Sequence, residues 1–421
     1  MRDAIGSPVR TGDATPAPVG VPFVTTYALA YMSVALMLIA PLLVTLALKI
    51  RSLVGPEQAP ASLALVTGVG GLLTVFSAPV FGRLSDRTSS RHGMRRPWMV
   101  GGLAGGVLGI GVVAAAANVA TVLAGWCLAQ LCFNALQAAL VAVLPDQVPL
   151  TQRGTVSGVL GITVPVAAVL GTFLVQLVEG NQAAMFLTPC VIGAVLVLGF
   201  AAKLNDRRLD PRNARPWAVR DLLTAFAAHP RRDPDFAWAF AGRFLFIGAY
   251  AFLTTYQAFY LLEHVGTSES QVPHQVFVAT SVQSAVLVVA SLTAGRFSDR
   301  TGRRKVFVVV AALTYGAALF VVAASHTFTG FLIGMAISGL GFGTYMAVDL
   351  ALVADVLPDP ANSARDMGLF NIANALPYAL APAVAPAILG ASDNSYGVLY
   401  AVAGTCAVLA AAAVLPIRGV R

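Results

Sequence analysis

The sequence predicts an all-α membrane protein with twelve transmembrane helices, arranged as two six-helix bundles related by pseudo-twofold symmetry. Three observations predict this fold class: an apolar composition, a series of long apolar runs, and a short charged phrase that occurs twice. Of the 421 residues, 57% are hydrophobic and only 11% are charged, whereas soluble domains carry about 25% charged residues. Because so few charges cannot cover a surface in water, we expect the bilayer to be the solvent of this chain.

The apolar runs predict the spans one by one. Each run is long enough to cross about 30 Å of hydrocarbon as a helix, whose backbone polar groups are bonded internally. The expected spans are residues 22–48, 62–82, 97–117, 120–144, 154–178, 184–203, 236–262, 274–295, 305–325, 328–356, 367–390 and 396–416. They form an N-terminal bundle at 22–203 and a C-terminal bundle at 236–416, with a central cytoplasmic loop at 204–235. Residues 1–21 are expected as a disordered cytoplasmic tail, and residues 417–421 as a second tail.

The positions of lysine and arginine predict the orientation. An even number of spans places both termini on one side of the membrane. Nearly all of the 27 basic residues fall in loops on that side, whereas Lys49 and Arg51 fall on the other and Arg243 lies within a span. The positive-inside rule therefore predicts a multi-pass protein of the cell membrane with both termini in the cytoplasm. Since the net charge of +8 follows the topology, we do not expect a nucleic-acid partner.

A repeated phrase indicates an internal duplication. GRLSDRT at residues 82–88 returns as GRFSDRT at residues 295–301, an offset of 213 residues. LPD at residues 144–146 recurs at 357–359 with the same offset. Two copies of a six-span unit are the simplest explanation, and two such bundles are expected to meet around a central site.

The phrase GRLSDRTSSRHGMRRPW resembles the signature loop between spans 2 and 3 of the major facilitator superfamily. DRTSSRHGMRRPW and FNALQAALVAVLPD are also similar to segments of the glycoside–cation symporters and of the sucrose-transporter-like branch. The resemblance implies a secondary transporter that works by alternating access. Three features depart from known branches: span 2 has no acidic residue, Gln130 and Val141 replace an acid and an arginine of plant-type sucrose carriers, and Pro165 lacks the neighbouring glycines of drug–proton antiporters.

The repeated phrase is interpreted as a latch between the bundles. Gly82 and Gly295 lack a β-carbon, which would let a neighbouring helix approach closely. Asp86 and Asp299 can accept hydrogen bonds at a helix N-terminus; the resemblance suggests span 11 for the first and span 5 for the second. Nearby arginines are expected to hold the aspartates or to pair across the interface: Arg87, Arg95, Arg300 and Arg304. The alternative is that these loops only satisfy the positive-inside rule.

Polar stripes inside the spans predict the substrate cavity. The resemblance implies a cavity lined by spans 1, 4, 7 and 10, and polar residues recur at helical spacing in each of them. The expected substrate-binding residues are Tyr27, Tyr31, Gln130, Asn134, Gln137, Arg243, Tyr250, Thr254, Gln257, Tyr345 and Asp349, with Asn371 and Asn374 contributing from span 11. The alternative role for each is a hydrogen bond that holds the bundle together.

Two charges lie well inside the predicted spans. Arg243 and Asp349 are at similar depths from the cytoplasmic ends of spans 7 and 10. Because an isolated buried charge is very unfavourable, we expect them to pair. The pair is either a static brace of the C-terminal bundle or a proton-coupling site, since burial favours the neutral carboxyl and Arg243 favours the carboxylate.

The leading functional interpretation is a transporter for a small, polar, neutral, sugar-like solute, with proton-coupled symport. The alternative is a proton-driven efflux carrier for amphipathic drugs or metabolites, and a second alternative is a non-transporting receptor. An enzyme or pump is not expected, because no Gly-Lys phosphate loop is present and the five histidines have no ligand spacing. The expected partners are the solute, a proton and the lipid bilayer; no cofactor or metal is expected, and the chain is predicted to be a monomer.

Overall fold

Every element that the structure describes is helical. The computed structural model describes residues 18–206, 234–301, 303–356 and 372–417. Eleven helices within these ranges are long and apolar enough to cross a membrane. The predictions for most of the two tails and of the central loop lie outside the described residues.

The first half of the chain begins with a helical stretch of 66 residues. At about 1.5 Å per residue it is roughly three times longer than a bilayer is thick, so it cannot be one span. The backbone departs from the helix at Gly55, where φ is 77° and ψ is 172°; this left-handed φ favours glycine. The stretch therefore supplies two passes. The elements of this half are α1 (Val21–Ala40), η1 (Pro41–Thr45), α2 (Leu46–Asp86), α3 (Arg96–Ala115), α4 (Val119–Gln147), α5 (Leu150–Leu177) and α6 (Gln182–Lys203).

The second half repeats this series. Its elements are α8 (Pro234–Phe259), η3 (Tyr260–His264), α9 (Val272–Thr301), α10 (Arg304–Ala324), α11 (Phe328–Val356), α13 (Pro377–Gly390) and α14 (Tyr396–Val414). With the first stretch counted as two passes, the described helices account for the twelve spans that the sequence predicts. The all-α membrane fold is thereby confirmed.

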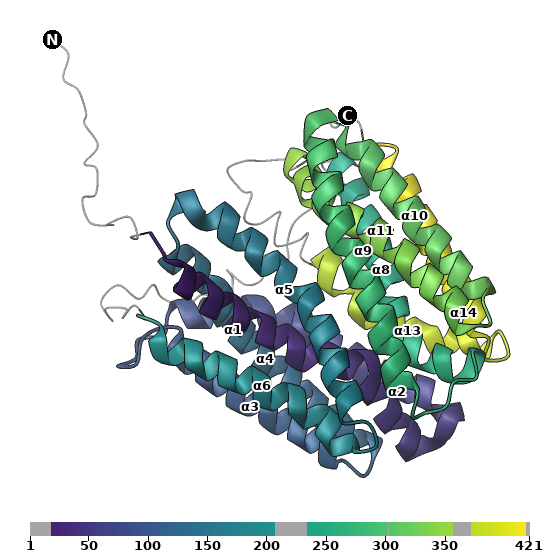
Figure 1. Ribbon diagram of the computed structural model, residues 1–421, viewed down its shortest axis with the longest axis horizontal. Helices are drawn as coiled ribbons and strands as arrows, with labels where there is room; N and C mark the ends of the chain where they lie inside the picture. Colours follow the sequence, from purple (N-terminus) through teal and green to yellow (C-terminus); the bar gives the residue numbers. More distant parts are fainter. Residues whose placement is uncertain (1–17, 207–233, 302, 357–371, 418–421) are drawn as a thin grey trace.

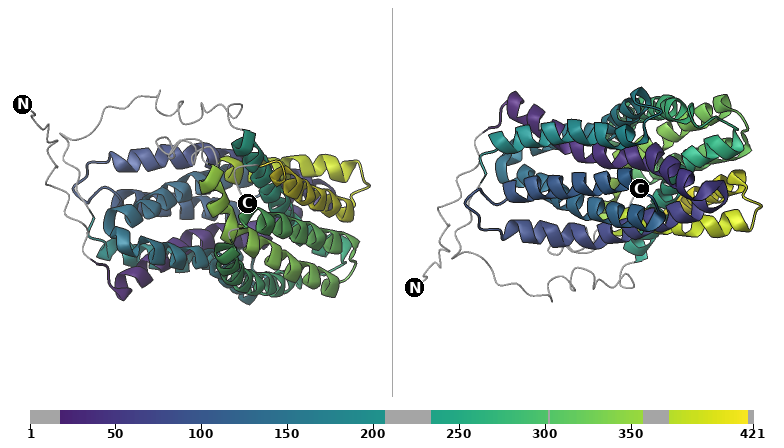
Figure 2. Two further views of the ribbon diagram at one scale, coloured as in Figure 1. Left: turned by 90° about the horizontal axis from the view of Figure 1, so that it is seen from above. Right: turned by 90° about the horizontal axis from the view of Figure 1, so that it is seen from below.

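The same helix pairs form in both halves. The pairs α3–α4, α2–α4 and α3–α6 of the first half correspond to α10–α11, α9–α11 and α10–α14 of the second. The contacts between the halves are α2 with α13 and α5 with α9, which correspond to each other in the same way. Figure 2 shows the two groups of helices on opposite sides of the molecule. This pairing is what a duplication with pseudo-twofold symmetry predicts.

Small residues allow the helices of each half to approach closely. A β-carbon at Gly109 of α3 would lie 2.6 Å from the backbone nitrogen of Ala129 in α4, and one at Gly125 would lie 2.8 Å from the carbonyl of Gly109. Neighbouring membrane helices gain van der Waals contacts in this way, because burial from lipid gives no hydrophobic driving force.

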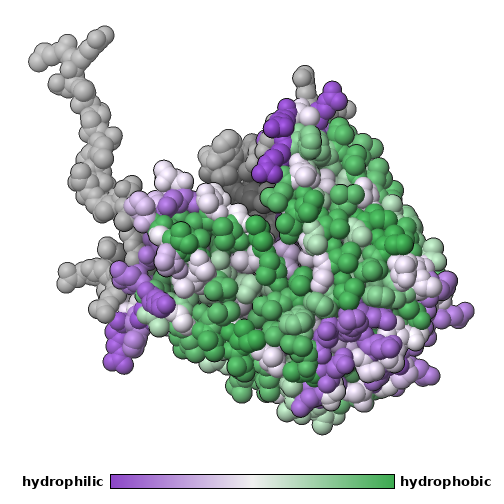
Figure 3. Space-filling view, viewed as in Figure 1, coloured by the Kyte–Doolittle hydropathy of each residue, from purple (hydrophilic) through white to green (hydrophobic). Residues whose placement is uncertain are grey.

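The outer surface is apolar between two polar ends. Large hydrophobic side chains such as Val191 and Val310 are 63% and 53% exposed, and Figure 3 shows a broad hydrophobic band with hydrophilic residues at the margins of the molecule. A surface of this kind matches the hydrocarbon and headgroup regions of a bilayer.

Candidate functional site

A cavity of about 270 Å³ lies between the two halves. Gly71, which lines it, is midway between the turn at Gly55 and the end of α2 at Asp86. The cavity is therefore near the middle of the membrane-spanning region, where transporters built from two repeats bind their solutes. Its lining combines apolar, hydroxyl, amide and aromatic groups: Leu38, Ile39, Leu42, Thr67, Gly71, Thr74, Trp126, Gln130, Asn134, Thr255, Asn374, Ala375 and Tyr378.

Three predicted residues line this cavity, and their amides are its most polar groups. They are Gln130, Asn134 and Asn374. The amide nitrogen of Asn134 donates to the Thr74 hydroxyl at 3.1 Å and to the backbone oxygen of Gln130 at 2.7 Å. Both N–H groups of Asn134 are thus used within the protein, so its carbonyl oxygen is the group left for a solute.

Trp126 also lines the cavity, although the stripe analysis did not select it. Its side chain is 1% exposed, and its indole Nε1 has no hydrogen-bond partner among the described residues. The indole lies against Gly70, where a β-carbon would be 2.7 Å from Nε1 and Cδ1. Glycine at this position makes room for the ring. The run TGVGG at residues 67–71 is the sequence signal that could have indicated a close approach here.

Tyr27 was predicted to bind substrate, but its side chain packs inside the N-terminal half. The tyrosine is fully buried, donates to the Leu140 carbonyl at 2.8 Å and stacks on Phe200 at 5.4 Å between centroids. Tyr31 hydrogen-bonds Gln137. Tyr27 and Tyr31 line a second pocket of about 250 Å³, together with residues of α4 and α5 only. None of these three predicted residues lines the central cavity, because they face α4 and α5.

The predicted polar stripe of span 7 is also mostly used within the protein. Thr254 donates to the carbonyls of Tyr250 and Ala251 in its own helix, and Gln257 is only 2% exposed. The neighbouring Thr255 lines the cavity instead. Tyr250 stacks on Phe342 with centroids 4.2 Å apart and meets Tyr378 of the cavity wall edge-on at 6.2 Å.

Arg243 and Asp349 form the predicted ion pair. Their side chains are 12% and 4% exposed, and Arg243 donates from Nη1 to the carboxylate. Tyr345 also hydrogen-bonds Asp349, while its ring stacks on Phe246 with centroids 3.6 Å apart. Arg243, Asp349 and Tyr345 are absent from the lining of the central cavity. They contact one another within the C-terminal half.

One end of the molecule is closed by contacts between the halves. Arg51, at the end of the first pass, forms ion pairs with Glu263 and Glu269 of the other half. Nearby, His274 hydrogen-bonds Gln176 at 3.3 Å. Deeper in the same interface, a β-carbon at Gly71 would lie 3.0 Å from the backbone of Ala379. Figure 1 shows the two groups of helices meeting where α2 and α13 lie side by side.

At the opposite end, the repeated phrase pairs within its own half. Arg95 is 5% exposed and contacts three side chains: Ser85 at 2.9 Å, Asp86 at 2.6 Å and Asp146 at 2.8 Å. Burial alone would lower the pKa of Arg95, but the carboxylates of Asp146 and Asp86 raise it above its ordinary value. Asp86 is thus held by Arg95, as one of the predicted arrangements proposed, and the LPD motif supplies the second carboxylate through Asp146.

The start of α3 is bound by an acid from the end of α6. Asp206 accepts hydrogen bonds from the backbone amides of Arg95 and Arg96 at 2.8 Å and 2.7 Å. Gly93, with φ 103°, allows this approach, since a β-carbon there would overlap Asp206. A carboxylate is favourable at this helix N-terminus. The predicted role of an aspartate at a helix start is therefore taken by Asp206 rather than by Asp86.

The predicted close approach at the two glycines is wrong for this structure. A β-carbon at Gly82 would meet nothing within 4 Å, and one at Gly295 would meet only Ala347 of its own half, at 3.9 Å. The reason is that the halves meet at the other end. Of the predicted arginines, Arg87 has a buried Nη1 without a partner among the described residues, Arg300 is exposed and Arg304 begins α10. Asn371 and the side chain of Asp299 lie outside the described residues.

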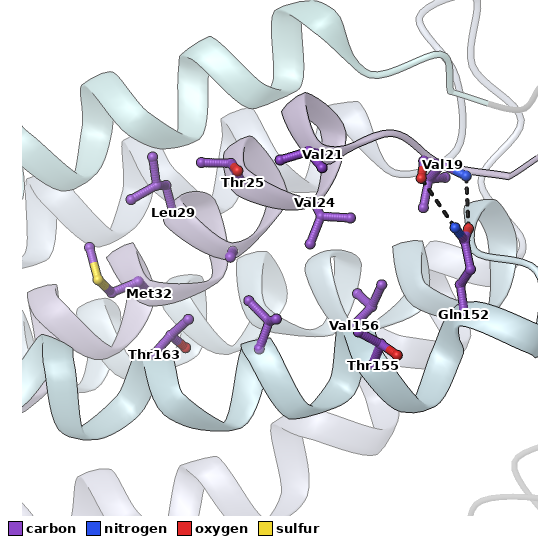
Figure 4. Close-up of a pocket in the computed structure, with 12 residues that line it drawn as sticks. Val19, Val21, Val24, Thr25, Leu29, Met32, Gln152, Thr155, Val156 and Thr163 are labelled. Carbon is purple, nitrogen blue, oxygen red and sulfur yellow. Dashed lines mark hydrogen bonds between the residues drawn. The ribbon is translucent and has the colours of Figure 1, made fainter. Parts of the chain in front are cut away.

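A larger cavity of about 520 Å³ lies between α1 and α5. Figure 4 shows it with Val19 and Gln152 at one end, where the Gln152 amide pairs with the Val19 backbone at 2.8 Å and 3.3 Å. Apolar side chains such as Leu29 and Val159, which are 36% and 38% exposed, make up most of its lining. This groove contacts only one half, so a movement between the halves would not open and close it.

Comparison with known proteins places this geometry in context. The model of the Major Facilitator Superfamily matches residues 23–280 and again 258–420. Multidrug resistance protein MdtL of Klebsiella pneumoniae is 34% identical over 134 residues, which is 31% of this chain and 31% of that protein. MdtL of Escherichia coli strain K12 is 34% identical over 120 residues, 27% and 29% of the two chains. The chain thus matches about a third of the length of these relatives.

Solved transporters share the fold over nearly the whole chain. The nucleoside transporter NupG aligns with a TM-score of 0.73 at 14% identity and covers 94% of this chain and 98% of its own. A bacterial homolog of the human lysosomal transporter Spinster, in an inward-facing and unoccupied conformation, aligns with a TM-score of 0.71 at 14% identity and covers 95% and 99%. At such low identity the likeness establishes the fold alone.

Proposed function

Because the chain belongs to the Major Facilitator Superfamily, we propose that it exports amphipathic organic compounds by alternating access of the central cavity. The proposal replaces the sugar-like solute as the leading interpretation. The relatives reported above are multidrug resistance proteins rather than glycoside carriers, despite the incomplete span 5 signature, and this observation carries the proposal. The cavity lining supports it: Leu38, Ile39 and Leu42 supply an apolar wall, whereas Trp126 and Tyr378 supply broad aromatic surfaces. Such a lining suits a ligand with a large apolar surface.

The positive-inside rule supports an orientation in which the end with Asp86 and Arg95 faces the cytoplasm of the cell. The end closed by Arg51 then faces outward, and the conformation described here is open inward. In this orientation the cavity receives its solute from the cytoplasm. The latch of the repeated phrase would form in the opposite conformation, once the inner ends of α2 and α13 approach each other. We take the working unit to be a monomer.

The buried pair Arg243–Asp349 is the proposed proton-coupling site. Protonation of Asp349 would release Arg243 from its partner, and the pair lies beside α11, which packs against both α9 and α10. Asp349→Asn should then abolish the dependence of transport on a pH gradient while solute exchange continues. If pH-driven transport by this variant is unchanged, the pair is a structural brace.

Transport in proteoliposomes tests the proposed function. Everted membrane vesicles or liposomes of known orientation should show pH-driven movement of an amphipathic fluorescent compound away from the cytoplasmic face. Movement of such compounds only toward the cytoplasm, or none at all, would contradict export. A receptor without transport activity would show binding but no flux.

A second candidate function is the uptake of a small, neutral, polar solute. The amides of Gln130, Asn134 and Asn374 favour it, since three amides in one cavity can hydrogen-bond a hydroxylated or heterocyclic ligand. A thermal-shift screen of the purified protein separates the two functions, because a bound ligand stabilises the folded state. Stabilisation by sugars or nucleosides, with none from amphipathic compounds, would favour uptake of a polar solute.

A further inference from the structure

We propose that Trp126 determines the specificity of the central cavity: its indole N–H binds a carbonyl or ring-nitrogen acceptor of an uncharged aromatic ligand. This inference rests on the proposed function, because it takes the cavity between the halves to be the transport site. It adds the chemical class of the ligand and the residue that selects it.

The indole N–H is a buried donor that the protein leaves unbonded. Trp126 is 1% exposed, and its Nε1 has no partner among the described residues. Buried polar groups are almost always hydrogen-bonded, because an unsatisfied donor loses its bonds to water without compensation. The protein nevertheless retains this arrangement, with Gly70 making room for the ring. A donor of this kind at the wall of a cavity is suited to an acceptor that arrives with the ligand.

Trp98 shows the ordinary situation of a tryptophan in this chain. Its indole Nε1 donates to the Thr88 hydroxyl at 2.7 Å. The unbonded state of Trp126 is therefore particular to its place beside the cavity. The ligand must bring an acceptor rather than a donor, because an indole nitrogen only donates.

The other polar groups of the cavity complement this donor. Asn134 uses both N–H groups within the protein and offers its carbonyl oxygen, so it favours a ligand that also carries a donor. Thr67 and Thr74 donate their hydroxyl protons to backbone carbonyls at 2.7 Å and 3.1 Å. Trp126 is thus a donor in this wall that no protein group already occupies.

The cavity favours an uncharged ligand. All thirteen residues that line it are neutral. An ionised group would lose its hydration here without a protein charge to compensate it, which is strongly unfavourable. The nearest candidates for compensation by chemistry, Arg243 and Asp349, are paired with each other outside this lining. At about 270 Å³ the cavity is slightly smaller than most drug-binding sites, which span roughly 300–1,000 Å³, so a compact ring system fits best.

Three tricyclic probes of similar size test the inference by equilibrium dialysis with the purified full-length protein. Acridone is neutral and carries a carbonyl acceptor; acridan is neutral and lacks the carbonyl; proflavine is a cation at neutral pH. We expect acridone to bind about tenfold more tightly than acridan, which corresponds to about 1.4 kcal/mol, and proflavine to bind more weakly than acridone. Equal binding of acridone and acridan to the wild-type protein, absence of acridone binding, or preferred binding of proflavine overturns the inference.

Two tryptophan variants assign the effect to one residue. Trp126→Phe keeps an aromatic ring but removes the N–H, and we expect it to bind acridone and acridan equally. The matched control is Trp238→Phe, because Trp238 is 44% exposed on α8 and absent from the cavity lining; it should keep the tenfold preference. A tenfold preference that persists in Trp126→Phe overturns the inference. If Trp126→Phe does not fold, the acridone–acridan comparison on the wild-type protein decides the outcome.

The same experiment separates this inference from the proposed export. If acridone binds through Trp126 but moves toward the cytoplasm in vesicles, export fails and the specificity of the cavity stands. If vesicles export amphipathic compounds while Trp126→Phe retains the preference for acridone, export stands and the role of Trp126 fails.

Discussion

Replacement of Arg243 by leucine should destabilise the protein strongly, because it leaves Asp349 as a buried carboxylate without a cation. Asp349 is 4% exposed and Arg243 is 12% exposed, so solvent screens the pair little. Two unit charges about 4 Å apart attract each other by about 4 kcal/mol at an effective dielectric constant near 20. Removal of one partner of a buried pair costs about 3–5 kcal/mol in measured cases. We therefore expect Arg243→Leu to lower the free energy of unfolding by about 3 kcal/mol or more.

A double-mutant cycle measures the interaction itself. The variants are Arg243→Leu, Asp349→Asn and the double variant, compared by reversible unfolding of the purified protein in detergent. The double variant has no buried charge at this place, so it should be more stable than the sum of the single effects predicts, by about 2 kcal/mol or more. Additive effects of the two substitutions would refute the argument that the two charges stabilise each other.

Three further substitutions test the two ends of the molecule. Arg51→Gln removes both ion pairs that join the halves; because these side chains are partly exposed, we expect a loss of about 1 kcal/mol and a roughly fivefold shift away from the conformation described here, measured by distances between spin labels. Gly71→Leu forces a side chain against the Ala379 backbone and should shift the same distances further, by about 1–3 kcal/mol; unchanged distances would show that α2 and α13 do not need this contact. Gly82→Leu enters open space, so it should leave the stability of this conformation unchanged but prevent closure of that end; normal transport by this variant would exclude a close approach at Gly82.

The architecture followed from the sequence because the bilayer leaves few alternatives. Apolar runs of fixed length must become spanning helices, since no other backbone structure satisfies its hydrogen bonds in lipid except a closed barrel. The exact repeat offset then predicted two similar bundles, and the repeated helix pairs agree with it. The pairing of Arg243 with Asp349 was also predictable, because two isolated charges at one depth can be accommodated only together.

The cavity was predicted less well, and the reason is visible in particular residues. Tyr27 and Gln130 both belong to polar stripes, but the first bonds a backbone carbonyl in its own half and the second lines the cavity. Helical periodicity groups residues on one face and does not tell which neighbour that face meets. Thr254 was selected over Thr255 for the same reason, since a threonine hydroxyl can always bond its own helix backbone.

The sequence by itself determined the number of passes, their duplication and the side of the membrane that its basic loops favour, because these depend on the composition and length of each segment. Only the tertiary structure decided which end of the two halves is closed, which amides meet in the cavity and that the Trp126 indole stays unbonded beside them. Those features arise from contacts between segments far apart in the chain, and their geometry depends on how the two halves are placed against each other.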